Sequence, residues 1–152
     1  MTKISTIHDT IYSRVAATLT DHKELWDPFV IENNDKLVLQ KGYGILLGTG
    51  SAGDRLVGCS TSLDREVVIA NTLAVFGPES NVSIRKTAEK ALYENQFKLI
   101  KAFEEDPDLS NLTNNFIFRS DSGIEFIFVT EERADYIMLQ SLFSFSYFET
   151  LT

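Results

Sequence analysis

A run of alternating side chains near the C-terminal end, residues 136–148 (YIMLQSLFSFSYF), most constrains what this chain folds into. Alternation with a period of two is typical of a strand buried on one side, because successive side chains of an extended chain point to opposite faces. The apolar side chains that share one face are Ile137, Leu139, Phe143, Phe145 and Tyr147. The run is also too short for the roughly 20 residues of a membrane-spanning helix. The pattern therefore predicts a long strand in a sheet.

A literal G-x-G-x-x-G sequence, GTGSAG at residues 48–53, follows an apolar run that we predict as a strand over 42–47. A dinucleotide-binding fold needs a helix next, since the helix N-terminus supplies the N–H groups that hold the pyrophosphate. Residues 54–62 have no helical apolar stripe, and residues 65–76 (REVVIANTLAVF) are β-branched and apolar, which predicts a second strand. The glycines are therefore expected in a flexible hairpin loop, where they tolerate positive φ, and no cofactor is predicted.

Two segments place apolar residues at the spacing of amphipathic helices. The first covers residues 3–19, and the second, the longest helix expected, covers 83–105 before the stop at Pro107. Lysines and glutamates mix on the outer side of the second helix, which predicts a solvated face. The apolar stripes are Ile4, Ile7, Ile11, Val15 and Leu19 in the first helix and Ile84, Ala88, Leu92, Leu99 and Phe103 in the second.

The remaining segments complete a fold of mixed class. Residues 21–34 are expected to form an ordered connection with one short extended piece, and the apolar runs 115–119 and 124–129 flank a predicted hairpin loop at 120–123 (SDSG). The element order α-β-β-α-β-β-β predicts an α+β fold, with two principal helices packed on one face of a mainly antiparallel sheet. No linker or repeat interrupts the chain, so residues 1–152 are expected to form a single domain.

Charge and composition exclude several classes of protein. The formal net charge of −8, without a clustered basic stripe, argues against tight binding to DNA or RNA. The first residues, MTKISTIHD, lack the pattern of a signal peptide, so we expect a soluble, unexported protein. The single cysteine, Cys59, excludes an intramolecular disulfide and suits a reducing cytosol. With only His8 and His22 beside it, no metal site is predicted.

No catalytic constellation is present in the sequence. The chain has no G-x-S-x-G elbow, no phosphate-binding G-x-x-x-x-G-K-[ST] loop and no H-E-x-x-H zinc motif. The acidic clusters at 104–106 and 131–132 lie at the ends of predicted elements, where solvated turns are expected rather than a pair of carboxylates placed across a cleft. No catalytic residue is therefore predicted, and we expect a protein that is not an enzyme.

The order and size of the elements resemble those of the tail terminator proteins of long-tailed bacteriophages of the lambda type. The features that carry the resemblance are the N-terminal helix, a strand ending in a polar, glycine-rich loop (42–64), the β-branched strand 65–76, the central helix 83–105 and the terminal hairpin 124–148. The resemblance implies a homo-oligomer, a hexameric ring on the last ring of the tail tube protein. Such a ring stops tube polymerisation and offers the docking surface for the head connector protein.

The same resemblance implies a location in the virion tail, and in the host cytoplasm during assembly. DNA would pass through the lumen of the ring without tight binding, and no membrane partner is expected. The candidate interface with a neighbouring subunit or the tube lies on the predicted loop and its charged flanks. Its residues are Gly50, Asp54, Arg55, Asp64 and Arg65. Two alternatives stay open: a phage head–tail joining or completion protein, and a small α+β ligand-binding protein that uses the loop 48–53.

Overall fold

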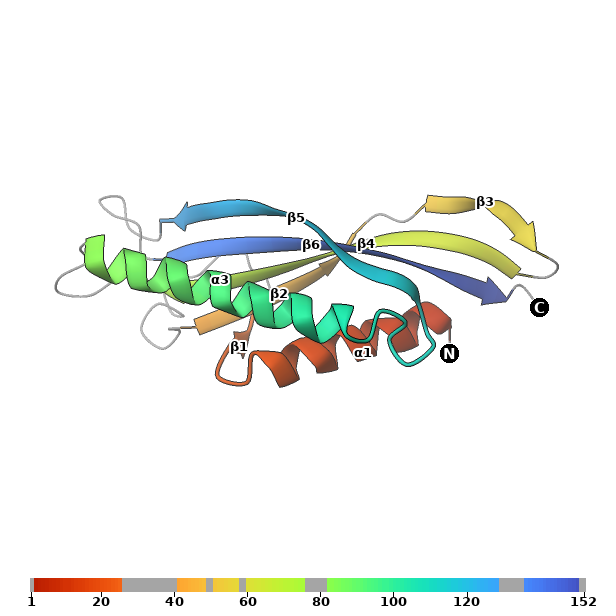
Figure 1. The fold of residues 1–152 in the computed structure, drawn as a ribbon, viewed down its shortest axis with the longest axis horizontal. Coiled ribbons are helices and arrows are strands. Elements are labelled where there is room, and N and C mark those ends of the chain that lie inside the picture. The colour runs from red at the N-terminus through yellow and green to blue at the C-terminus, as the bar shows by residue number, and fades with distance from the viewer. Residues whose placement is uncertain are drawn as a thin grey trace.

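The computed structural model describes residues 2–25, 41–48, 51–57, 60–75, 82–128 and 136–150, with the backbone alone at 51–57 and 60. These residues form an α+β fold, as predicted (Figure 1). In chain order the elements are α1 (Lys3–Thr18), β1 (Lys23–Glu24), β2 (Lys41–Leu47), β3 (Ser51–Val57), β4 (Ser60–Ala74), α3 (Val82–Glu104), β5 (Asn114–Ile127) and β6 (Tyr136–Thr150). The predicted helices, the strand at 42–47 and the long C-terminal strand are therefore confirmed.

The sheet has the strand order β1-β2-β4-β6-β5, and β3 also pairs with β4. The short strand β1 runs parallel to β2, with Lys23 opposite Gly42, whereas the other neighbours are antiparallel. The sheet is therefore mixed, which corrects the prediction of a mainly antiparallel sheet. The parallel pair arises because the short strand β1, which follows α1, lies along the edge of β2 and runs in the same direction.

The glycine-rich segment belongs to a long β-hairpin and not to a long loop. Leu47 in β2 lies opposite Val67, and Ser51 in β3 lies opposite Asp64, so the β2–β3 side has one residue more than β4 between these pairs. Within β3 the register with β4 also shifts between Ala52 and Leu56, beside Gly53, which is the pattern of a β-bulge, where glycine is common. The amide of Gly48 donates to the carbonyl of Glu66 at 2.7 Å, so it is already engaged in the sheet. The loop predicted to follow the strand 42–47 is wrong for residues 51–57 and 60–64, which lie in β3 and β4.

The predicted hairpin loop at 120–123 is also wrong. Residues 115–119 and 124–129 were expected as separate strands, but β5 is one strand that pairs with β6 through three shifts of register. At one shift, Gly123 has φ +70°, and its amide is bonded to Asp121 Oδ1 at 3.0 Å. The amide of Gln140 in β6 donates to Ser122 Oγ at 3.2 Å. The turn residues therefore form a bulge on an edge strand, a feature that also hinders edge-to-edge aggregation.

Side chains of both helices and of four strands share one large apolar cluster. Val67 and Ile69 define the face of the sheet that borders this cluster, called here the core face, and Glu66 and Val68 lie on the opposite outer face. The predicted buried face of β6 is confirmed. Members of the cluster include Ile7, Ile11 and Val15 of α1, Leu99 and Phe103 of α3, Tyr43 and Ile45 of β2, Phe116 of β5, and Phe143, Phe145 and Tyr147 of β6.

Three strands continue past α3 as an arm, whose core face packs on the N-terminal part of α1. The arm consists of β3, residues 60–66 of β4 and residues 144–150 of β6, which pair in the order β3-β4-β6. Figure 1 shows it continuing past the N-terminal end of α1. Phe145 and Tyr147 of the arm are buried against α1, and Lys3 N donates to Glu149 Oε1 at 3.4 Å, so only the tip of the arm projects.

Candidate functional site

A groove lies where β5 crosses β6 beside the base of the arm, with a volume of about 660 Å³. Carboxylates, guanidinium groups, amides and hydroxyls from three strands line it. Arg119 Nε donates to Ser144 Oγ at 2.7 Å, which holds one guanidinium at the β5 rim. The lining residues are Asp64, Arg65, Glu66, Asn114, Asn115, Ile117, Arg119, Ser144, Phe145 and Ser146. The groove is a polar recess suited to matching polar groups of a partner.

Two of the predicted interface residues line this groove, but not as a pair at the end of a loop. Asp64 and Arg65 are consecutive residues inside β4, so their side chains leave the sheet on opposite faces. Asp64 is exposed, whereas Arg65 is half-buried and its Nε has no hydrogen-bond partner among the described residues. The expectation that this pair marks the point where a loop re-enters the sheet is therefore wrong.

Of the other predicted interface residues, the structure describes the backbone of Asp54 and Arg55 but not Gly50. Asp54 and Arg55 lie in β3, between Ala52 and Leu56, where the register with β4 shifts. They belong to the same arm as Asp64, in strand rather than in the predicted loop. Gly50 and Cys59 lie outside the described residues. Contact of any of these residues with another subunit stays a prediction.

A second polar cluster, which the sequence did not reveal, surrounds His22. The His22 side chain is only 3% exposed, and its Nδ1 lies 2.8 Å from Asp21 Oδ1. Its Nε2 lies 3.4 Å from Asn95 Nδ2 of α3, and Asn95 donates to Asn71 Oδ1 of β4 at 2.9 Å. Asn71 in turn donates to the carbonyl of Gly42 in β2 at 3.0 Å. The cluster thus links the end of α1, α3 and two strands.

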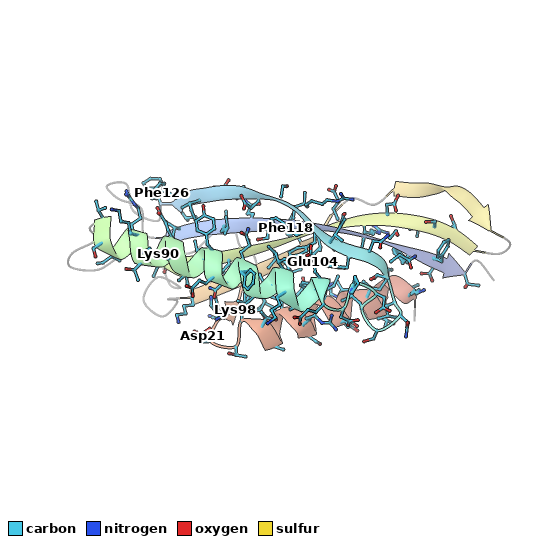
Figure 2. All side chains as sticks on the ribbon, in the orientation of Figure 1. Asp21, Lys90, Lys98, Glu104, Phe118 and Phe126 are labelled. Atoms are coloured by element: carbon cyan, nitrogen blue, oxygen red, sulfur yellow. The ribbon has the colours of Figure 1, made fainter. Side chains whose placement is uncertain are left out.

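Burial and the surrounding charges shift the pKa values of His22 and Asp21. Hydrogen bonds from Lys41 and His22 lower the pKa of Asp21 to about 2. Burial lowers the pKa of His22, and although Asp21 opposes this shift, the charges of Lys41 and Lys98 add to it. Figure 2 places Lys98 on the side of α3 towards Asp21.

The ring of His22 is held for structure rather than offered to a substrate. Since the Asn95 amide is a donor, the arrangement suits a neutral ring that donates from Nδ1 and accepts at Nε2. A general base needs that lone pair free to meet a substrate. The adjacent residues Asp21 and His22 gave no sign of this, because the partners Asn71 and Asn95 are distant in sequence.

Within 2–25, 41–48, 60–75, 82–128 and 136–150, no three histidine, cysteine, aspartate or glutamate side chains gather as metal ligands. No helix in the described part of the chain is long and apolar enough to cross a membrane.

Comparison with known proteins adds no family to these observations. A scan of protein-family models finds no match to the sequence, and neither does a search of curated proteins. The function is therefore argued from the fold, the arm and the charge of the chain.

Proposed function

We propose that this chain is a tail terminator of a long-tailed bacteriophage, a protein without catalytic activity that closes the tail tube as a homo-oligomeric ring. The observation that carries the proposal is the arm, whose three strands continue past α3 and whose tip extends beyond the N-terminal end of α1. In the proposed subunit, α1 and α3 pack together on the core face and leave the outer face and the tip of the arm free to reach a neighbour. Their shared apolar cluster supports this packing.

A ring requires two different and complementary patches on each subunit, since its contacts run head to tail. The arm supplies one such patch at an end of the molecule, with the polar groove at its base. Exposed charges at such contacts contribute more to partner choice than to the stability of the fold. In the proposed assembly six subunits close the ring. One face of the ring lies on the tube protein, and the other faces the head connector.

Net charge agrees with a channel for DNA. At −8 the chain repels phosphate, and without clustered basic residues it lacks the counterion release that drives tight binding. A ring of such subunits would let DNA pass without retaining it. Submicromolar binding of duplex DNA at physiological salt by the purified protein would contradict this part of the proposal.

The decisive experiment removes the protein from the phage that encodes it and measures tail length by electron microscopy. A terminator predicts overlong, uncapped tubes, and the purified protein added to growing tubes should arrest them at a fixed length. Tails of normal length that fail to join heads would instead identify a head–tail joining protein. Normal, infectious particles without the protein would overturn both assignments.

A further inference from the structure

The outer side of α3 carries an exposed ridge of aromatic and basic residues. Tyr93 and Phe97 are 47% and 66% exposed, although large aromatic side chains are usually covered. The ridge consists of Lys86, Lys90, Tyr93, Phe97 and Lys101, whose spacing of three and four residues places them along one side of a helix. All five are exposed. A solvated helix face explains the lysines but not the two aromatic rings.

The outer face of the sheet carries a strip of the opposite character. Leu46, Val68 and Leu142 face one another across β2, β4 and β6, and Leu46 is 44% exposed. Further along the same face, Phe148 lies opposite Ser62 and is also 44% exposed. Two exposed carboxylates of β4 lie between these apolar positions, those of Asp64 and Glu66. This outer-face strip is therefore apolar at both ends and acidic in the middle.

The ridge and the strip match in length and in chemistry. Fifteen helical steps from Lys86 to Lys101 span about 22 Å, and six strand steps from Ser62 to Val68 span about 20 Å. Helix α3 has five basic and three acidic residues in a chain whose net charge is −8, so the ridge is basic within an acidic protein. One basic residue, Arg119, lies on the same side as the strip. Its guanidinium is held by a hydrogen bond to Ser144 at the β5 edge of the strip.

We infer that the α3 ridge of one copy docks on the outer-face strip of a second copy of this chain. The aromatic rings would cover the apolar row, and the lysines would approach Glu66 and Asp64. The two surfaces of one copy cannot meet, because the ridge lies on the outer side of a helix that packs on the core face and the strip lies on the opposite face of the sheet. Contacts of this kind run head to tail and form closed rings or filaments. The inference rests on the proposed ring and names its interface.

Photo-crosslinking of the purified full chain tests the contact directly. A benzophenone amino acid at position 97 should crosslink to peptides covering 62–68 or 142–148 of another copy, as mapped by mass spectrometry. The same probe at position 9, on α1, is the control and should give no such product. Crosslinks from position 97 only to other segments, or none at millimolar protein concentration, would overturn the docking.

Charge exchange provides a second, independent measurement. Lys90→Glu or Glu66→Lys alone should weaken self-association in sedimentation velocity, and the chain carrying both should recover it, since every contact then regains an opposite pair. Phe97→Ser should weaken it by about tenfold, as expected for a central aromatic anchor. Lys23→Glu is the matched control, because Lys23 is an exposed lysine on β1 and lies off the ridge.

The outcomes separate the docking from the proposed function. All these substitutions are at exposed positions, so the melting temperature should stay unchanged and a loss of association cannot be ascribed to unfolding. Single variants that associate like the wild type, or a double variant without recovery, would contradict the docking even if tails are capped normally. If the crosslinks and the recovery are as expected but tail length does not change when the protein is removed from the phage, the docking is supported and the terminator assignment is wrong.

Discussion

His22 and Asn95 join the end of α1 to α3 inside the protein, with Nε2 of the imidazole 3.4 Å from the amide nitrogen. The opposite ring nitrogen is 2.8 Å from Asp21, so both ring nitrogens have partners. Protonation of Nε2 would place a donor against the Asn95 donor and a positive charge near Lys41 and Lys98. The cluster therefore favours the neutral ring and makes folding sensitive to pH.

The first prediction is a loss of stability as the pH falls below 6.5. Burial lowers the pKa of folded His22 below its ordinary value of 6.5, so below that value the unfolded chain binds more protons. Stability is full above pH 6.5 and falls as the pH decreases towards the folded pKa. His22→Gln should flatten this slope in urea unfolding followed by circular dichroism. His8→Gln, at a side chain that is 47% exposed, is the control and should keep it.

A second change is expected at lower pH from Asp21. Its pKa is lowered to about 2, so the stabilisation is present above its ordinary value of 3.8 and is lost as the pH falls towards 2. The effect should be small, because the Asp21 side chain is 61% exposed and water screens the contact with Lys41. Lys41→Met should reduce it, because the hydrogen bond from His22 then remains, and an unchanged acid limb in that variant would contradict the assignment.

The third prediction concerns the aromatic core. Phe103 is fully buried, with its ring centroid 4.5 Å from that of Phe116 and 5.3 Å from that of Phe143. Phe103→Ala should lower the free energy of unfolding by about 3–5 kcal/mol, because the cavity cannot be refilled by rigid neighbours. Phe97→Ala on the same helix should cost no more than about 0.5 kcal/mol. Equal losses of unfolding free energy for the two variants would contradict the burial of Phe103 in the aromatic core.

The fourth prediction tests the bulge in β5. Gly123 has φ +70°, and a Cβ there would meet nothing within 4 Å, so only the backbone conformation opposes a side chain. Gly123→Ala should therefore cost about 1–2 kcal/mol, the penalty of a left-handed residue. Gly123→Asn should cost less, since asparagine tolerates this region. The free energies of unfolding are measured by chemical denaturation. If both substitutions leave them nearly unchanged, Gly123 does not occupy the bulge.

Much of the fold was predictable from local patterns. Helices with clear apolar stripes and the alternating strand 136–148 form as expected, because each buries a continuous apolar surface. The hairpin loops predicted from the glycine segment 48–53 and from the SDSG sequence at 120–123 were wrong, because residues suited to turns also suit bulges inside long strands. Local sequence does not distinguish these cases, since the choice depends on whether a partner strand continues alongside.

The candidate site was less predictable for a related reason. Asp64 and Arg65 were recognised as charges near the glycine segment, but their separation onto two faces follows only once β4 is known to include them. The partners of His22 come from β4 and α3, and the ridge on α3 is marked by exposure of Phe97, which no sequence pattern reports. Tertiary contacts therefore decided what the residue types alone left open.

The last prediction separates assembly from folding at the arm. Asp64 is exposed on the outer face, so Asp64→Arg combined with Asp54→Arg should leave the melting temperature of the monomer nearly unchanged, since an exposed charge contributes only about 0–1 kcal/mol. The double variant should fail to form rings in size-exclusion chromatography with light scattering, and tails assembled with it should be overlong. Asp9→Arg, an equally exposed charge reversal on α1, is the control and should assemble normally. Because Arg65 points to the other face, the exchange variant Asp64→Arg with Arg65→Asp should also fail to assemble, although its net charge is that of the wild type. Normal rings and tails from the folded double variant would exclude the arm from the interface.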